Sequence, residues 1–493
     1  MTKQLFSTVI FFLFSCSILV AQNHQDAFLF SESANIGTAR SSAMANAFGA
    51  LGADVSVLST NPAGLGVYQS YEFSYSLSLS GHDKTSYFKN NKIVNSVGSF
   101  NVPSVGFIAP VKTDNNSDWR RFNIGLAYNT NNIFRSNTVQ NGYNANSSLV
   151  DVFLNSATGY QLDELNPFFE LAAFDTDLID LQTDSTGWID DGNYFREVES
   201  GQDQFKQTDI SGSSGEFVLS YAGAYQEKLY LGATLGLTNI NFRKNSRYNE
   251  RNFADTNSTV QFFDMYENQY TTGAGVNLKI GGIYRANDNL RLGLAWHSPT
   301  LYDMHDEWEM QLRTQHEFND SSYAYTYSSP YGVYDYTITT PMKVIGSAAI
   351  VLNNFLLSAD VELVDYSTMK IDGDDYDYFN EQNNIITSNY TSVVNSRIGA
   401  ELNLSPFVLR GGYSHNQIPY IQDDAGYSLD NFRNERKSYS VGFGKRGKYR
   451  YIDLSYVFSE YSQSDALYST FYEPAHKVTN TSYSLIFTMG WKF

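Results

Sequence analysis

Apolar and small polar residues alternate one by one along many stretches of this 493-residue chain. One early stretch has apolar side chains at Tyr71, Phe73, Tyr75, Leu77 and Leu79. The end of the chain repeats the pattern at Tyr483, Leu485, Phe487, Met489, Trp491 and Phe493. Because successive side chains of a strand point to opposite faces, the alternation predicts strands with one apolar, aromatic face and one small or polar face.

Fourteen stretches have this character, and the connections between them alternate in length. The stretches lie near 71–80, 99–109, 119–130, 214–225, 228–242, 270–285, 289–313, 335–352, 355–366, 393–403, 406–414, 437–446, 449–461 and 478–493. Short turns such as Gln226-Glu227 alternate with long loops, the largest of which covers about 131–213. Outer-membrane barrels have short periplasmic turns, long outer loops and an even strand number. We therefore predict an all-β, membrane-spanning antiparallel β-barrel of about 14 strands over 71–493, in which 289–313 could be two strands split near Pro299.

The composition agrees with spanning strands. Aromatic residues make up 15% of the chain, yet its mean hydropathy is −0.34. Alternation dilutes the hydrophobicity of each strand, and aromatic residues form the girdles at both membrane interfaces. The net charge of −19 argues against a nucleic-acid partner, which would require a basic surface. The acids lie largely in the predicted loops, so the charge says little about a substrate.

Residues 1–21 have the features of a secretory signal peptide. Lys3 supplies the positive start, residues 5–20 are almost wholly apolar, and Ala21 is a small residue at a plausible cleavage point. A membrane anchor is the alternative, but the apolar run is short for a spanning helix. Cys16 could be a lipidation site, although Phe14 is bulky there and the apolar run continues past it. Because Cys16 is the single cysteine, neither an internal disulfide nor a multi-cysteine zinc site can form.

Residues 22–70 differ from the strands that follow. The stretch 41–52 is rich in small residues and too poor in large apolar groups to form a core by itself. The segment Asn61-Pro62-Ala63-Gly64 then predicts a tight, irregular connection before the first strand. We expect this region to lie inside the barrel as an N-terminal hatch.

Three segments resemble the FadL/TodX family of outer-membrane transporters. Residues 47–54 (AFGALGAD), leading into 61–65 (NPAGL), resemble the family's N-terminal hatch. Residues 278–285 with 290–300 are similar to its central hairpin, and 357–362 with 365–367 agree further. The resemblance covers the hatch and about half of the strands, whereas the large outer loops match nothing known to us. It implies a 14-stranded barrel plugged by the hatch.

The same resemblance implies passive transport of long-chain fatty acids or other hydrophobic molecules across the bacterial outer membrane. Substrate would be captured by the outer loops, pass the rearranged hatch and leave sideways into the lipid. A haemin or aromatic-compound receptor and a structural or adhesive barrel are the alternatives. The terminal Phe493 looks like the signal that the barrel-assembly machinery recognises, so that machinery and outer-membrane lipid are the other expected partners.

Charged residues on the predicted strands should face the lumen. If Leu290, Leu292 and Leu294 face lipid, Arg291 points inward, since a charge facing lipid costs about 2–4 kcal/mol at the midplane. The same parity gives a set of candidate lumen charges: Lys279, Arg291, Asp360, Glu362, Arg397, Glu401 and Arg410. An inward cation could hold a substrate carboxylate. The alternative is a lattice of acids and bases that pair with one another.

The largest loop offers a candidate capture surface. Its segments 149–154 and 166–174 have roughly helical apolar spacing. The residues that could capture an apolar substrate are Phe153, Phe168, Phe169 and Phe174. A self-packed loop cap is the equally favoured interpretation.

No catalytic group or metal site emerges from the sequence. The seven histidines are scattered, and none has the ligand spacing of a known zinc motif. His297 could be imagined as a base or haem ligand, but a polar residue at a strand end is far more common. The acidic loop Asp372-Gly373-Asp374-Asp375 could bind calcium, although its spacing is not that of an EF-hand. We therefore expect a protein that is not an enzyme and has no cofactor.

Overall fold

The computed structural model describes residues 22–34, 36–113, 117–184, 187–189, 191–421, 434–468 and 472–493. The predicted signal peptide, residues 1–21, lies outside the described residues.

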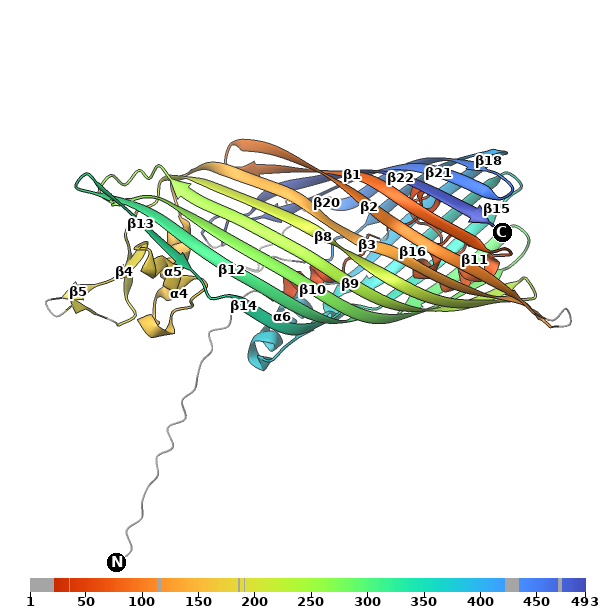
Figure 1. The fold of residues 1–493 in the computed structure, drawn as a ribbon, viewed down its shortest axis with the longest axis horizontal. Helices are drawn as coiled ribbons and strands as arrows, with labels where there is room; N and C mark the ends of the chain where they lie inside the picture. Colours follow the sequence, from red (N-terminus) through yellow and green to blue (C-terminus); the bar gives the residue numbers. More distant parts are fainter. Residues whose placement is uncertain are drawn as a thin grey trace, which may run out of the picture.

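A single antiparallel sheet closes on itself to form an elongated barrel (Figure 1). Its fourteen wall positions are, in order, β1 (Glu72–Phe88), β2 (Asn91–Lys112), β3 (Trp119–Asn144), β8 (Gln202–Tyr225), β9 (Leu229–Arg251), β10 (Val260–Arg285), β11 (Leu290–His297) with β12 (Leu301–Phe318), β14 (Gly332–Thr339) with β15 (Lys343–Val351), β16 (Phe355–Asp365), β18 (Ser392–Leu404), β19 (Phe407–Asn416), β20 (Asn434–Arg446), β21 (Arg450–Asp465) and β22 (His476–Lys492). The pairing of β22 with β1, from Lys492↔Glu72 to Val478↔Ser86, closes the wall. The predicted all-β antiparallel barrel of about 14 strands is confirmed.

Two wall positions hold two strands each, because prolines interrupt them. Pro299 separates β11 from β12, and β10 pairs with both. On the next wall position Pro341 separates β14 from β15, which pair with β12 and β11 respectively. Proline has no N–H to donate to the ladder. The alternative split near Pro299 is therefore present, but its two halves share one position and leave the strand count unchanged.

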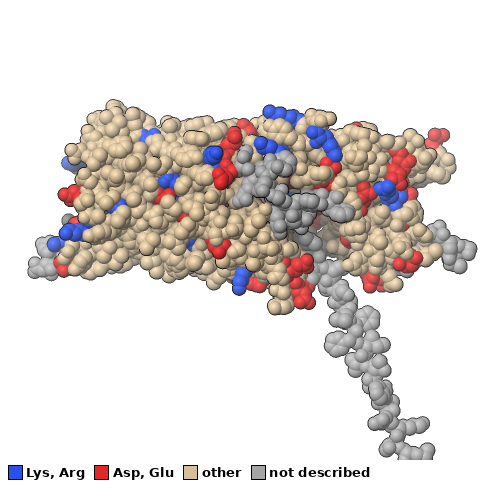
Figure 2. All heavy atoms as spheres, turned by 180° about the vertical axis from the view of Figure 1, so that it is seen from behind, with Lys and Arg blue, Asp and Glu red and all other residues tan. Residues whose placement is uncertain are grey.

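The outer face of the wall is apolar and exposed, whereas the inner face carries small polar groups. On β8 and β9, Phe217 is 60% exposed and Leu237 is 54% exposed. Ser220 and Thr234, which point inward from the same strands, are buried and hydrogen-bonded to each other at 2.6 Å. A continuous exposed apolar surface of this kind requires a nonaqueous environment, and a closed barrel leaves no unpaired edge in it. On the face shown in Figure 2, the larger acidic patches lie near the middle of the molecule and towards the end that carries the long loops.

Among the residues that the structure describes, no helix is both long enough and apolar enough to cross a membrane.

Residues 22–70 form short helices inside the barrel (Figure 1). They are α1 (His24–Ser31), α2 (Ala39–Ala43), α3 (Val57–Thr60) and the 3₁₀ helix η1 (Pro62–Val67). Each helix is too short to be stable alone, so the wall around it must hold it in place. Met44, Phe48 and Leu51 pack with Ala349 of the wall, while Leu58 and Leu65 pack with Ile108 and Val218.

The strands continue farther outward than the sequence pattern indicates. The loop expected at 131–213 covers only 145–201, because β3 runs to Asn144 and β8 begins at Gln202. It contains α4 (Leu149–Ala157), η2 (Leu162–Glu164), α5 (Glu170–Asp175), β4 (Ile179–Leu181), β5 (Thr183–Asp184), β6 (Gly187–Trp188) and β7 (Tyr194–Arg196). Other loops add β13 (Ser321–Ser328), η3 (Tyr366–Thr368), β17 (Lys370–Asp372) and α6 (Tyr376–Asn389).

Candidate functional site

The Asn-Pro-Ala-Gly segment fixes the hatch to the inside of the wall. Asn61 donates through Nδ2 to the carbonyl oxygens of Gly49 at 2.6 Å and Gly282 at 3.3 Å. Its Oδ1 accepts a hydrogen bond from Ala63 N at 3.1 Å. One buried amide therefore connects two parts of the hatch to strand β10.

Glycines in the wall allow the hatch to approach closely. A Cβ on Gly232 of β9 would lie 2.5 Å from the carbonyl oxygen of Pro62, and one on Gly293 of β11 would lie 2.3 Å from that of Gly49. Pro62 begins η1, where its missing N–H is not needed. Gly64 is buried against Val57. The Asn-Pro-Ala-Gly segment is thus one of the parts of the hatch that lie in close contact with the wall.

All seven predicted lumen charges lie on inner-facing positions of the wall. Lys279, Asp360, Glu362, Arg397 and Arg410 are buried, and Arg291 and Glu401 are half-buried. Six of the seven engage groups of the protein itself. The exception is Arg291, which has no ion pair in the described part of the chain and whose Nε has no hydrogen-bond partner there.

Several of these charges form ion pairs within the wall. Lys279 pairs with Glu216, and Arg397 Nη2 lies 3.0 Å from Glu362 Oε2. Arg410 lies 2.6 Å from Glu401 and 2.8 Å from Asp453. This arrangement is the charge lattice that was the alternative to substrate binding.

Two further contacts connect the lattice to the hatch. Arg40 Nε of α2 lies 3.0 Å from Glu401 Oε2, and Gly49 N donates to Asp360 Oδ2 at 3.0 Å. Burial alone would lower the pKa of Arg40, but the charge of Glu401 raises it well above its usual value. The hatch is therefore held by charged groups as well as by close packing.

Above this lattice the barrel contains an apolar chamber, which α1 fills. Its buried residues are Ala27, Phe30, Phe134, Ile240, Phe242, Tyr302, Met304, Tyr336, Ile338, Val364, Tyr366, Met369, Ile371, Phe379, Ile386, Tyr390 and Val393. Phe30 of the hatch meets Phe134 and Phe242 edge-on, with ring centroids 6.0 and 5.6 Å apart. α1 of the hatch thus packs into an apolar cluster that the wall forms together with the loop that carries α6.

A small polar pocket of about 70 Å³ adjoins the apolar chamber. Phe30 and Tyr302 line the pocket and also belong to the chamber. The ionisable residues that line it are Glu32, Glu216, Lys279, His297, Lys343 and Glu362. The apolar chamber and the charged pocket therefore lie side by side, with Phe30 of α1 and Tyr302 of the wall between them.

Lys343 is the unpaired cation of this pocket. The three acids have other partners: Glu216 pairs with Lys279, Glu362 with Arg397, and Glu32 with Arg436 at 2.9 Å. Within the described residues, Lys343 Nζ makes no ion pair or hydrogen bond. Sequence reasoning missed Lys343, because apolar residues occupy both alternating sets of β15 and leave its parity undetermined.

The wall has a gap in its ladder between β2 and β3. Their pairing runs from Lys112↔Arg121 to Ser104↔Asn129 and ends there within the described residues, although β2 begins at Asn91 and β3 continues to Asn144. Pro103 lies where the pairing ends and cannot donate a hydrogen bond. Beyond this point the backbone of β2 pairs with β1 and that of β3 pairs with β8. Side chains still connect the two strands, since Thr130 Oγ1 donates to Val102 O at 3.1 Å and Asn91 Nδ2 donates to Asn141 O at 2.9 Å.

The hatch occupies the position that β2 leaves. Ala34 N donates to Asn131 O at 2.9 Å, and Ile36 N donates to Thr130 O at 3.3 Å. On the outer side of the gap, Phe100 is 63% exposed. The apolar outer surface therefore lies on one side of the gap. On its inner side is β3, whose Phe134 lines the apolar chamber.

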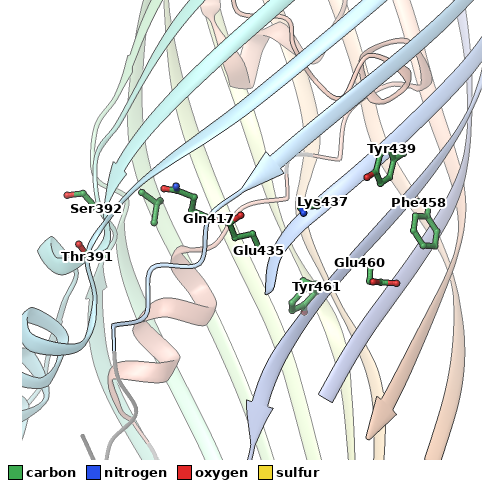
Figure 3. A pocket seen from close by; sticks show the side chains of 10 residues that line it. Thr391, Ser392, Gln417, Glu435, Lys437, Tyr439, Phe458, Glu460 and Tyr461 are labelled. Atoms are coloured by element: carbon green, nitrogen blue, oxygen red, sulfur yellow. The ribbon is translucent and has the colours of Figure 1, made fainter. Parts of the chain in front are cut away.

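A larger pocket of about 580 Å³ lies on the outer face of the wall (Figure 3). Ser392, Gln417, Glu435, Lys437, Tyr439 and Glu460 are among its lining residues. Lys437 and Tyr439 share the parity of Val441, which is 59% exposed on the outside. Most of its lining is polar and on the outer face, although Val393, which belongs to the apolar chamber, lines it too.

The predicted capture surface is packed against itself. Phe153 is fully buried and Phe174 is 9% exposed, within one cluster formed by the largest loop and the outer strand ends. Phe169 packs on Phe153 with ring centroids 4.5 Å apart, and Phe168 lies 5.8 Å from Trp308. Only Phe168 and Phe169 are partly exposed. In this conformation the loop forms the self-packed cap that was the alternative interpretation.

The groups weighed for catalysis or metal binding have structural contacts. His297 is buried, and its Nε2 lies 2.8 Å from Thr60 O of the hatch. Asp375 caps α6 by accepting from Tyr378 N at 2.8 Å. Among the residues that the structure describes, no group of three or more His, Cys, Asp or Glu side chains could hold a metal ion.

Comparisons with known proteins identify the fold. No family profile and no curated protein matches the sequence. A FadL homologue from Pseudomonas aeruginosa superposes with a TM-score of 0.57 at 10% identity, over 93% of this chain and 98% of that one. The toluene transporter TodX of P. putida gives 0.52 at 13% identity, over 94% and 99%. The monoaromatic hydrocarbon channel CymD gives 0.50 at 11% identity, over 93% and 98%. The chain therefore has the fold of the FadL and TodX proteins, as the hatch sequence led us to expect.

Proposed function

We propose that this protein is a passive outer-membrane transporter for hydrophobic molecules, with long-chain fatty acids as its substrate class. The observation that carries the proposal is the apolar chamber beside the unpaired Lys343. A fatty acid has the same two parts, a long apolar chain and one carboxylate. The toluene and hydrocarbon proteins that share the fold support a hydrophobic substrate in general.

The two parts of the site would contribute differently to binding. Each buried methylene group of the acyl chain is worth about 0.8 kcal/mol. The carboxylate would form a charge-assisted hydrogen bond with Lys343 Nζ, in a pocket whose own acids are already paired. Because Phe30 now fills the chamber, α1 must shift before the chain can enter.

Release into the lipid would use the gap between β2 and β3. A hydrophobic molecule that leaves sideways avoids crossing water, and the apolar chamber reaches this gap through Phe134. The hatch segment at Ala34 and Ile36 must then separate from β3, which costs two backbone hydrogen bonds. Capture, hatch movement and lateral release are thus connected by the same short segment.

Insertion of the barrel would involve the assembly machinery and the terminal residue. Phe493 is 72% exposed, and its N–H donates to Tyr71 O at 3.0 Å, at the end of the barrel with the short turns. We propose that the machinery recognises this exposed ring, as in other barrels that end in an aromatic strand.

Substitution of Lys343 tests the substrate class. We expect Lys343→Met to reduce uptake of labelled oleate about tenfold, the effect of losing about 1.4 kcal/mol of charge-assisted binding. Uptake of toluene, which has no carboxylate, should remain within twofold of the parent level. Lys343→Arg is the matched control and should retain oleate uptake, because it preserves the charge.

The outcome separates fatty acids from the alternatives. Equal loss of oleate and toluene uptake in Lys343→Met would reject a carboxylate site while leaving hydrophobic transport intact. Unchanged uptake of both compounds in a gene deletion would reject transport itself. A haemin titration with a Soret shift at micromolar concentration would favour the receptor alternative instead.

A further inference from the structure

Two carboxylates surround the start of the hatch deep inside the barrel. Gln22 is 2% exposed, and its Nε2 donates to Asp306 Oδ2 at 3.1 Å. Tyr378 Oη donates to Gln22 O at 2.8 Å. Asp26, in the first turn of α1, accepts a hydrogen bond from Asn23 N at 3.2 Å. Gln22 therefore lies between an acid of the hatch and an acid of the wall.

These two acids lack a compensating charge. Asp306 is fully buried, and its Oδ1 has no hydrogen-bond partner among the described residues. Neither acid forms an ion pair in that part of the chain. Desolvation and the charge of Asp306 raise the pKa of Asp26 to about 7, against weaker opposing effects of Lys244 and His24. A buried carboxylate without a cation is strongly destabilising, so each acid must either take up a proton or gain a positive neighbour.

We propose that the missing cation is the α-ammonium group of Gln22, formed when an export peptidase cleaves the bond between Ala21 and Gln22. Water adds across this peptide bond: Ala21 leaves as a carboxylate, and the nitrogen of Gln22 becomes a protonated amine. Consecutive backbone nitrogens are at most about 3.7 Å apart, so the new ammonium lies close to the Asp26 carboxylate that Asn23 N already reaches.

An α-ammonium group suits this site better than the uncleaved amide. It offers three donors in place of one, and it carries the positive charge that both acids lack. In the uncleaved chain the same nitrogen is neutral and has one hydrogen. Processing would therefore complete the docking of α1 in the apolar chamber. This inference does not depend on the identity of the transported molecule.

Mass spectrometry of the protein purified from outer membranes tests whether cleavage leaves Gln22 as the first residue. We expect the N-terminal peptide to begin at Gln22 with a free α-amine. A different first residue, an acylated amine, or a Gln22 cyclised with loss of ammonia would each overturn the proposal, because each removes the charge or its position.

The rate at which the α-amine of Gln22 is acylated tests whether it interacts with Asp26 and Asp306. An acylating reagent at neutral pH should label Gln22 in the folded protein at least about tenfold more slowly than in the urea-unfolded protein. Asp306→Asn should restore fast labelling, whereas Asp303→Asn, an exposed acid on the outer face of β12, should not. Gln22→Ala loses the side-chain amide but retains the ammonium, so it should still be labelled slowly. Equal labelling rates in Asp306→Asn and the parent would contradict the proposal, and heat-modifiable migration on gels verifies that each barrel is folded.

Discussion

Lys279→Met is expected to lower the free energy of unfolding by about 3 kcal/mol. Lys279 and Glu216 form an ion pair on the inner wall, and their side chains are 8% and 2% exposed. Removal of the lysine leaves a buried carboxylate without its cation. We place the loss at the lower end of the usual range for a broken buried pair, because Asn277 at 3.0 Å and Ser59 at 2.9 Å continue to donate to Glu216.

The double variant Lys279→Met/Glu216→Gln should recover most of this loss. Removing both charges removes the desolvation cost as well as the attraction, so the exchange is close to neutral. Urea unfolding in lipid vesicles, followed by tryptophan fluorescence, measures all three proteins. Equal destabilisation in the single and double variants would contradict a structural ion pair. Oleate uptake that stays low in the refolded double variant would instead give Lys279 a role in substrate binding.

The barrel wall could be predicted because lipid imposes a rule on every spanning strand. Leu292 and Leu294 must face outward, so Arg291, which directly precedes Leu292, faces inward, and the structure has this arrangement. The rule ends where the strands leave the bilayer. Outside it, β3 continues to Asn144 in a regular ladder, but water accepts polar groups on its outer face and the alternation disappears from the sequence.

The interior could be predicted only in part, because its contacts join residues far apart in the chain. Local sequence placed Asn61 in a hatch, but it could not indicate that Phe30 would fill a chamber with Phe134 and Phe242. Lys343 was missed for a different reason: Ile345 and Ile350 lie on opposite faces of β15, so no parity was distinguishable. The predicted capture residue Phe153 is apolar enough to bind substrate, but the same property buries it in its own loop.

The gap between β2 and β3 was also beyond the sequence pattern. Pro103 by itself predicts only one missing hydrogen bond. The opening depends on where β3 pairs after Asn129, and on the hatch backbone that hydrogen-bonds with it at Thr130 and Asn131. The alternation of residues along one strand does not specify which strand or segment will hydrogen-bond with it.

Gly232→Val should displace the hatch without disrupting the wall. A Cβ at position 232 would lie 2.5 Å from both the carbonyl carbon and oxygen of Pro62 and 2.8 Å from Ala63 N. These are backbone atoms, so no side-chain rotation relieves the clash, whereas valine itself is favourable in a strand. Overpacking of about 1–3 kcal/mol corresponds to an increase of about 5- to 150-fold in the population with the hatch undocked.

Conductance in planar bilayers measures this population directly. The parent barrel should be nearly closed, and Gly232→Val should show long open events that the parent lacks. Gly282→Val is the matched control on the neighbouring strand, since a Cβ there meets only Leu231 Cδ2 at 3.5 Å and Tyr230 O at 3.9 Å. If both variants conduct equally, the conductance comes from a valine-induced change in the wall rather than from displacement of the hatch. If only Gly232→Val conducts, the contact between β9 and Pro62 is what keeps the path closed.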